Sequence, residues 1–531
     1  MSKMTTPITP NSKWDLSSWT IFYFSTTFIL LIVYYLLTYF TSPLRRYPGP
    51  LLAGFTNLWR VYYIRQKKFH LVTEELHKKY GPVVRIGPNV LDVDYPELMK
   101  VVFGVKGEWK KTGSVLASST LVGGKIALNL FSQTDPEIHA KWKRPVAKYY
   151  SANAVASLEG HVDRTLNGFL EEIEKRFLKE KGEWSEGVDL GKWLGFYTWD
   201  SIGALTFSEN LGYLSTGRDF DGTLLTAQKS MDYFCTCYGL PILDRLLDKN
   251  PFAVFRKFGP PGFGPIAMRT IKRIMARVEG KDKDFHSADQ PDYLDKFLEA
   301  KKLNPEVVDD NVLFGYLMNN MVAGSDTTAN VLRATIYHGL KDGKRVWNKL
   351  SEEVLHKFRA AGNGPVDYKA ARGLEYLHAV IKEALRASSP VALGLERYVP
   401  KGGVTLPGEH GWFVPEGAIL AFNPWVMNHN KMVFGEDADK FRPERWLKGD
   451  GETQKQYERR LVMMNNYDFT FGGGSRSCIG KHIAFMQLYK VLATLVLMYD
   501  LELLDPEREW QVYNRLFITQ EGLEVRMKRR M

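Results

Sequence analysis

The sequence contains only three cysteines, Cys235, Cys237 and Cys478, among 531 residues. Two of them are separated by one residue and the third is remote, so neither a disulfide framework nor a zinc ligand set is present. We interpret Cys235 and Cys237 as packing residues, because no further ligand type accompanies them. The scarcity of cysteine predicts a main domain in a reducing compartment, on the cytosolic side.

The sequence also lacks internal repeats, long low-complexity tracts and an arginine-rich arm. Its net charge of +11, from 71 basic and 60 acidic residues, is not concentrated in one segment. Nucleic-acid binding is therefore disfavoured, and the mild excess suits a membrane-facing protein or an acidic partner. Length alone would suggest about three or four domains, but no break in composition divides the chain.

One long uncharged run is present, from Trp19 to Phe40. As a helix rising about 1.5 Å per residue it would cross a bilayer core of about 30 Å. A secretory signal peptide is the alternative, but its apolar core should be shorter and end at a small-residue cleavage site, whereas Ser42-Pro-Leu-Arg-Arg46 follows here. We predict a lumenal tail (residues 1–18), a transmembrane anchor (19–40), a basic, proline-containing hinge (41–50) and one main domain (51–531).

Charges around the run predict its orientation. Arg45, Arg46 and Arg60 follow it, while only Lys3 and Lys13 precede it. This excess favours keeping the C-terminal bulk in the cytosol.

Helical periodicity dominates the main domain, so the predicted fold class is mainly α with a small β-rich part. A helix is expected over His70–Tyr80 and a hairpin over Val83–Val93, turning at Gly-Pro-Asn. We also expect mostly helical structure from Pro136 to Leu340 and short strands from Val399 to Val414. A final helix is expected over Cys478–Met498, followed by short β-strands.

Cys478 lies in the run Phe471-Gly-Gly-Gly-Ser-Arg-Ser-Cys-Ile-Gly480. A thiolate needs positive surroundings, which Arg476 and the N–H groups of a following helix would supply. Haem iron accepts such a thiolate as its fifth ligand, and the sulfur then favours O–O cleavage. A lone cysteine, however, is more often a small buried hydrophobe.

The glycine cluster could instead hold a phosphate. A P-loop needs Gly, four residues, then Gly-Lys-Ser/Thr, but Ser475 occupies the first position and His482 the last. A dinucleotide fingerprint should lie near the start of a βαβ unit, whereas this run is close to the C-terminus. Every fixed position of F-x-x-G-x-R-x-C-x-G is satisfied, and the run resembles the haem-ligand loop of the cytochrome P-450 family.

A second segment, Ala323-Gly-Ser-Asp-Thr-Thr328, falls inside a predicted long helix that Asn304 would cap and Pro305 would begin. Glycine costs about 1 kcal/mol against alanine in a helix, and a threonine hydroxyl can bond back to the i−4 carbonyl and bend it. We expect a local opening here, although a simple packing adjustment would be the commoner explanation of such a segment alone.

Beside the cysteine loop, this segment resembles the oxygen-activation segment of the same family. The resemblance implies that Thr327 hydrogen-bonds the oxygen being activated and that Asp326 helps to relay protons. Splitting O–O heterolytically takes two protons in a mostly dry pocket, so a hydroxyl and an acid are suited to carry them.

A third pattern is Glu383-Ala-Leu-Arg386, followed by Phe441-Arg-Pro-Glu-Arg-Trp446. Glu and Arg three positions apart share a helix face and can pair, although most such pairs are solvated. By resemblance, Glu383, Arg386 and Arg445 would lock together and hold the cysteine loop in place without taking part in the chemistry.

The resemblance also implies partners for the two haem propionates, which call for arginine or lysine. Arg476 and Arg397 are candidates, and Phe471 is counted with the cofactor-binding residues. The segment His139–Arg144 resembles the family's W/H-x-x-x-R helix imperfectly, because Lys143 holds the expected arginine position and Arg144 is the next residue. Either could reach a propionate, and a solvated face is the alternative for one of them.

The motifs occur in family order along the whole chain, which resembles a membrane-tethered microsomal monooxygenase with the cytochrome P-450 fold. In detail it is similar to fungal enzymes of secondary metabolism, near the pisatin demethylase and benzoate hydroxylase-like groups. The resemblance implies haem b ligated by Cys478, a lipophilic small-molecule substrate and a single-pass endoplasmic reticulum anchor. Electrons would come from NADPH through a separate cytochrome P-450 reductase, with cytochrome b5 as a second candidate donor.

Other functions remain open at this point. A haem–thiolate isomerase or dehydratase would not use O2, but such enzymes often lack the threonine that is present here as Thr327. A non-catalytic haem carrier or sensor would not need the proton-relay segment. A detoxifying hydroxylase or demethylase of a xenobiotic aromatic is a further alternative.

Four basic residues lie near the loop in sequence and are expected to meet an acidic partner: Lys455, Arg459, Arg460 and Lys481.

Overall fold

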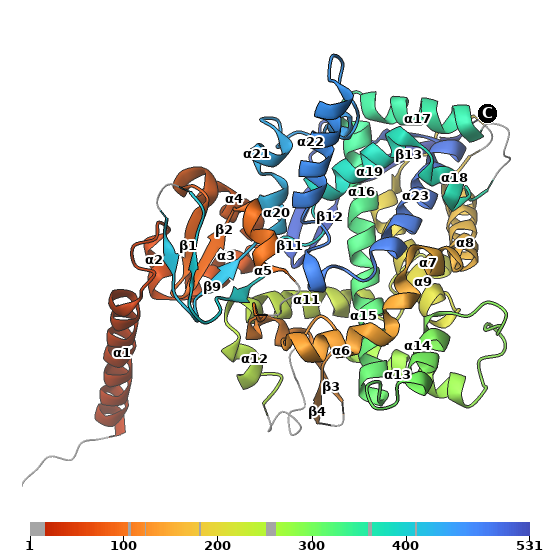
Figure 1. The fold of residues 1–531 in the computed structure, drawn as a ribbon. Helices are drawn as coiled ribbons and strands as arrows, with labels where there is room; N and C mark the ends of the chain where they lie inside the picture. The colour runs from red at the N-terminus through yellow and green to blue at the C-terminus, as the bar shows by residue number, and fades with distance from the viewer. Residues whose placement is uncertain are drawn as a thin grey trace, which may run out of the picture.

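The computed structural model describes residues 16–104, 108–122, 124–179, 182–250, 262–358, 364–408 and 411–530. Helices form most of the molecule, and the sheet that contains β1, β2 and β9 lies on the side from which α1 extends (Figure 1). The fold is thus mainly α with small sheets, as predicted. Residues 1–15 of the predicted tail lie outside the described residues.

Several helices begin at a capping side chain, such as Asp309 before α15, or end at a glycine, such as Gly81 after α4. Their bounds are α1 Leu16–Thr41, α2 Leu51–Phe55, α3 Leu58–Arg65, α4 Phe69–Tyr80, α5 Met99–Val102, α6 Pro136–Ala147, α7 Ala152–Ala156, α8 Glu159–Phe177, α9 Leu190–Phe207, α10 Tyr213–Thr216, α11 Thr223–Gly239, α12 Ile242–Leu246, α13 Gly264–Val278, α14 Tyr293–Leu303, α15 Asp310–Gly324, α16 Asp326–Lys341, α17 Arg345–Phe358, α18 Tyr368–Arg372, α19 Glu375–Ala387, α20 Pro424–Asn428, α21 Lys431–Phe434, α22 Gln454–Tyr467 and α23 Lys481–Met498.

The strands are short and form one four-stranded sheet (β1-β2-β9-β6), one three-stranded sheet (β10-β13-β5) and three pairs (β11-β12, β3-β4 and β7-β8) among the described residues. Their bounds are β1 Val83–Gly87, β2 Val90–Val93, β3 Thr120–Val122, β4 Lys125–Ala127, β5 Val188–Asp189, β6 Arg397–Tyr398, β7 Val404–Thr405, β8 Phe413–Val414, β9 Ile419–Ala421, β10 Tyr499–Leu503, β11 Gln511–Arg515, β12 Phe517–Glu521 and β13 Glu524–Arg529. The predicted hairpin is the antiparallel pair β1–β2.

Helix α1 extends away from the main body (Figure 1). Its window Trp19–Thr41 is apolar, long enough to span a membrane and 0% buried. Its last turn nevertheless contacts the domain, because the ring of Tyr39 stacks on Phe55 at a centroid distance of 4.3 Å. Helix α23 has a similar length and composition, but 67% of its window is buried, so α23 is a core helix.

Arg60, one of the basic residues that follow the predicted anchor, is buried in the domain. Its side chain is 3% exposed and its guanidinium pairs with the carboxylate of Glu396 at 2.5 Å. A buried charge needs such a partner, and the pairing sets Arg60 inside the domain.

The start of the long helix was predicted wrongly. Asn304 ends α14 instead, where its Nδ2 donates to the carbonyl of Ala300 at 3.1 Å. Helix α15 begins at Asp310, and the carboxylate of Asp309 accepts from the N–H of Val312 at 2.8 Å. An aspartate whose carboxylate accepts a hydrogen bond from the backbone N–H three residues later is a strong N-cap. The helix therefore begins five residues after Pro305, where the sequence had suggested its start.

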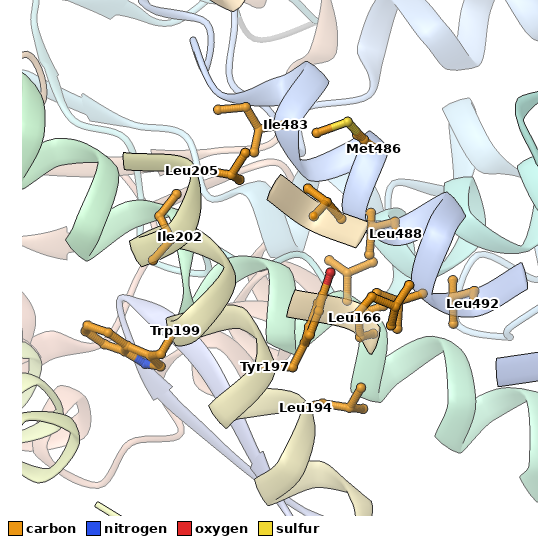
Figure 2. Close-up of a cluster of buried hydrophobic side chains, with 14 of the residues drawn as sticks. Leu166, Leu194, Tyr197, Trp199, Ile202, Leu205, Ile483, Met486, Leu488 and Leu492 are labelled. Carbon is orange, nitrogen blue, oxygen red and sulfur yellow. The ribbon is translucent and has the colours of Figure 1, made fainter. Parts of the chain in front are cut away.

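The core holds α23 in place. Figure 2 shows Leu205 and Ile202 of α9 on the side facing Ile483 and Met486 of α23, with Leu488 and Leu492 further along. These side chains are at most 5% exposed. The predicted final helix therefore exists, although residues 478–480 form the turn before it. Because α23 is fixed by its core face, the cysteine loop at its N-terminal end is positioned with it.

Candidate functional site

A cavity of about 290 Å³ lies between the α15–α16 junction and the cysteine loop. The wall from the helices includes Ala323 and Thr327, and the wall from the loop includes Phe471, Arg476 and Cys478. The lining is mostly apolar. Two motifs that are far apart in the sequence thus meet at one site.

The helix opens at the predicted segment. Helix α15 ends at Gly324 and α16 begins at Asp326, with Ser325 between them. The hydroxyl of Thr327 donates to the carbonyl of Ala323 at 2.7 Å, which is the back-bonding that bends helices. Glycine at 324 lets α9 approach closely, because a Cβ there would lie 2.6 Å from a methyl carbon of Ile202 and would force that side chain to shift.

Thr327 and Asp326 lie differently with respect to the cavity. Thr327 lines it. The carboxylate of Asp326 instead accepts from the indole N–H of Trp199 at 3.1 Å, and Asp326 is absent from the lining. Burial raises the pKa of Asp326, while the charge of Arg333 and the hydrogen bond from Trp199 act against that rise.

The cysteine loop is held by its glycines. Gly474 has φ +55°, and a Cβ there would lie 1.4 Å from the carbonyl oxygen of Phe103, so only glycine fits. The backbone N–H of Cys478 donates to the carbonyl of Phe471 at 2.9 Å. This closed turn directs the side chain of Cys478 to the cavity that it lines, so its accessible surface faces the cavity inside the protein.

Opposing effects act on the Cys478 thiol. On balance the pKa of the thiol is raised, because desolvation by the surrounding protein outweighs the N–H groups of Gly480 and Lys481 and the positive charges of Lys143 and Lys481, which lower it. Without a bound metal the thiol form is therefore favoured. The same donors and charges would help to stabilise the thiolate that ligates a metal ion.

Basic side chains gather at the same cavity. Four basic residues line it, namely Lys111, His139, Lys143 and Arg476, and the described lining residues include no aspartate or glutamate. Burial lowers the pKa of Arg476 to about 10, and burial together with these cations lowers the pKa of His139 to about 3. Unpaired buried cations are unfavourable, so this end of the cavity suits a ligand with anionic groups.

The four candidate propionate partners lie at different places. Arg476 lines the cavity and donates to the carbonyl of Gln133 at 2.8 Å. The Nζ of Lys143 donates to the carbonyls of Ser475 and Ser477 at 3.1 and 3.2 Å, whereas Arg144 is exposed on α6. Arg397 is buried, donates to its neighbour's carbonyl and packs over the ring of Phe103, outside the described lining.

Lys111 is a site residue that sequence reasoning missed. It belongs to no motif, and an isolated antiparallel bridge sets it opposite Arg397. Its Nζ donates to the carbonyl of Phe131 at 2.7 Å, and burial lowers its pKa. Only the three-dimensional pairing brings it to the cavity.

The glutamate–arginine pattern forms a buried cluster. Glu383 pairs with Arg386 at 2.7 Å and with Arg445 at 3.2 Å, and all three side chains are at most 1% exposed. The indole of Trp446 donates to the same carboxylate at 2.9 Å. Helix α19 is thereby tied to the segment Pro443–Trp446.

Comparison with known proteins places these motifs in a family. The family model "Cytochrome P450" matches residues 48–527. The chain is 43% identical over 508 residues to cytochrome P450 monooxygenase cfoH of Aspergillus candidus, covering 96% of this chain and 92% of that protein. It is 37% identical over 459 residues to a cytochrome P450 monooxygenase of Aspergillus terreus, covering 85% and 89%. It spans only 55% of the longer mpaDE protein of Penicillium roqueforti, at 35% identity.

Proposed function

The chain belongs to the cytochrome P450 family and is an oxygen-incorporating oxidoreductase, and we propose that it inserts one oxygen atom of O2 into a C–H bond of a lipophilic small molecule. The other oxygen atom leaves as water, with two electrons supplied by NADPH through a separate reductase. A fungal secondary-metabolite pathway is the proposed setting.

One observation supports this proposal most strongly. Cys478 and Thr327 line a single, mostly apolar cavity that also holds basic side chains, with no aspartate or glutamate among its described lining residues. These residues fit haem, because the sulfur offers an axial ligand and the cations suit two carboxylates. We propose Cys478 as the ligand of the iron, with Arg476, Lys143 and Lys111 holding the carboxylates. Arg397, which lies outside the lining, would add its positive charge to that of Arg476. Phe471 would support the loop.

Haem, when bound, supplies the activation of oxygen. The chain's own residues would deliver protons and exclude water. The hydroxyl of Thr327 already donates its proton to the carbonyl of Ala323. The oxygen of this hydroxyl can therefore accept a hydrogen bond from a donor in the cavity. Asp326, bonded to Trp199, would exchange protons with solvent from the other side of the helix. Glu383, Arg386 and Arg445 would keep the loop in position.

The anchor and the redox partner complete the proposal. We propose that residues 19–40 span the endoplasmic reticulum membrane once and that residues 51–531 form the cytosolic catalytic domain. Lys455, Arg459 and Lys481 are exposed and suit docking of an acidic reductase or cytochrome b5. Arg460 is removed from that set, because its guanidinium bonds Glu452 and the carbonyl of Leu447.

The proposed function is tested by reconstituting the protein with reductase and comparing fungal extracts with and without the chain by mass spectrometry. A new product heavier by one oxygen, labelled when ¹⁸O2 is supplied and dependent on NADPH, is expected. Product formed without O2 would identify an isomerase or dehydratase instead. Bound haem without any turnover in extracts from the native host would indicate a carrier or sensor.

A further inference from the structure

Three positions of the α15–α16 segment line the cavity at intervals of four residues: Asn319, Ala323 and Thr327. Residues at i, i+4 and i+8 lie on one side of a helix, and eight residues rise about 12 Å. The row begins at a primary amide, passes a single methyl group and ends at the threonine hydroxyl. The cavity wall thus has a polar group about 12 Å along the helix from Thr327.

The amide of Asn319 is available to a ligand. The side chain is half-buried and lines the cavity. Within the described parts of the chain, it has no hydrogen-bond partner. Its neighbours Met318 and Val322 are apolar and line the same wall, so they offer nothing that could satisfy its N–H and C=O groups.

The adjacent Asn320 gives independent support. Its side chain is 7% exposed, and its Oδ1 accepts from the hydroxyl of Tyr150 at 2.5 Å. Its Nδ2 is buried and has no partner among the residues that the structure describes. A buried donor left unpaired is unfavourable, so this turn of the helix is built to meet a hydrogen-bond acceptor.

The surroundings determine what kind of polar group fits. The lysines and the arginine of the described lining (Lys111, Lys143 and Arg476) come from outside α15 and α16. Met231 of α11 and Phe263, which precedes α13, add apolar groups to the lining of the same cavity. A carboxylate would be desolvated there without a cation on the helix, whereas an uncharged oxygen needs only the amide.

We propose that Asn319, supported by Asn320, anchors the substrate through an uncharged oxygen function, a hydroxyl or a carbonyl, on the end remote from the carbon that is oxidised. This inference rests on the proposed function and names its substrate class: a lipophilic molecule that already carries a neutral oxygen. A free carboxylic acid does not belong to that class. Asn319 is a specificity-determining residue in this account.

Three size-matched probes test the anchor: 4-hydroxybiphenyl, biphenyl and biphenyl-4-carboxylate. Each is titrated into haem-loaded protein, and binding is followed by the shift of the haem absorption band. The wild-type protein is expected to bind the phenol about three- to tenfold more tightly than biphenyl, the range of one net hydrogen bond. The carboxylate should bind more weakly than the phenol. In Asn319→Leu, the preference for the phenol should disappear while biphenyl binds within about twofold of wild type.

Val322→Ile is the matched control, because it reshapes the same wall of the cavity without removing a hydrogen bond. It should move the affinities for phenol and biphenyl together. Equal wild-type affinities for these two probes, a preference that survives in Asn319→Leu, or a preference for the carboxylate would each overturn the proposal. All titrations use protein that shows the thiolate-type spectrum of the reduced carbonyl complex. Loss of that spectrum would count against the proposed function, and loss of the phenol preference only against the anchor.

Discussion

The guanidinium of Arg445 lies 3.2 Å from the carboxylate of Glu383, and the two side chains are 1% and 0% exposed. Arg386 binds the same carboxylate at 2.7 Å. This carboxylate therefore joins α19 to the segment Pro443–Trp446 in the interior of the protein. Removing it would leave the buried guanidinium of Arg386 without an acidic partner, while Arg445 would keep only Asp437, at 2.9 Å.

Glu383→Ala is expected to destabilise the protein by about 3–5 kcal/mol, because breaking a buried ion pair leaves uncompensated charge. The measurements are the thermal unfolding midpoint and the haem content of purified protein, both of which should fall sharply. Arg345→Ala is the control, since Arg345 pairs with Glu444 at 2.9 Å but is 50% exposed. Such a surface pair contributes about 0–1 kcal/mol. Similar losses in the two variants would contradict a special role for the buried cluster.

Lys143 and Arg144 form a natural pair of test positions. Lys143 lines the cavity, and Arg144 is exposed on the same helix. Lys143→Ala is expected to lower haem occupancy several-fold, because it removes a cation from the wall that would hold a carboxylate and from the surroundings of Cys478. Arg144→Ala should leave occupancy unchanged. Haem content per protein, measured by absorbance, checks both, and the opposite ranking would assign the contact to Arg144.

Thr327→Ala is expected to uncouple NADPH consumption from product formation and release peroxide, because the hydroxyl that positions protons at the cavity is lost. Thr335→Ala is the matched control: its hydroxyl makes the same i−4 bond, to Val331 at 2.8 Å, in the same helix but away from the cavity. The measurement is the ratio of product to NADPH oxidised. An unchanged ratio in Thr327→Ala would remove this residue from proton delivery.

Stability is expected to fall in mild acid. Burial lowers the pKa of His338 from 6.5 to about 4, and its ring stacks on Phe441 at a centroid distance of 4.8 Å. The unfolded chain takes up this proton near pH 6.5 while the folded chain does not. The stabilisation is therefore complete above pH 6.5 and is lost as the pH falls towards 4. The loss is of the order of 1–3 kcal/mol.

Unfolding midpoints measured at pH 7.5, 6, 5 and 4 check this expectation. His338→Phe should make the fall shallower, because it removes one proton-binding group and keeps the aromatic stack. The fall should not vanish, since burial also lowers the pKa of His70 and His429 to about 4. An equally steep fall in the variant would show that His338 is not one of the groups responsible.

Local signals in the sequence predicted local structure well. The helix ending at Gly81, the β1–β2 hairpin and the opening at Gly324 each depend on residues a few positions apart. The start of α15 was predicted wrongly because two residues that can cap a helix, Asn304 and Asp309, lie only five positions apart. The choice depends on α14, which uses Asn304 for its own C-terminus.

The rest of the site depends on contacts between remote segments. Lys111 reaches the cavity only through its bridge to Arg397, and Arg60 is buried only because Glu396 receives it. Neither residue carries a motif. The amide of Asn319 in the cavity wall and the unpaired Nδ2 of Asn320 likewise become evident only from the structure.

The most direct test of the account concerns the sulfur of Cys478. The reduced carbonyl complex of the wild-type protein should show the absorption band typical of thiolate ligation, and Cys478→Ala should abolish it. Cys235→Ala combined with Cys237→Ala should retain it, because both of these cysteines are buried in another part of the core. A thiolate-type band that persists in Cys478→Ala, or a wild-type protein that folds and binds no haem, would contradict the assignment of this cavity as a haem–thiolate site.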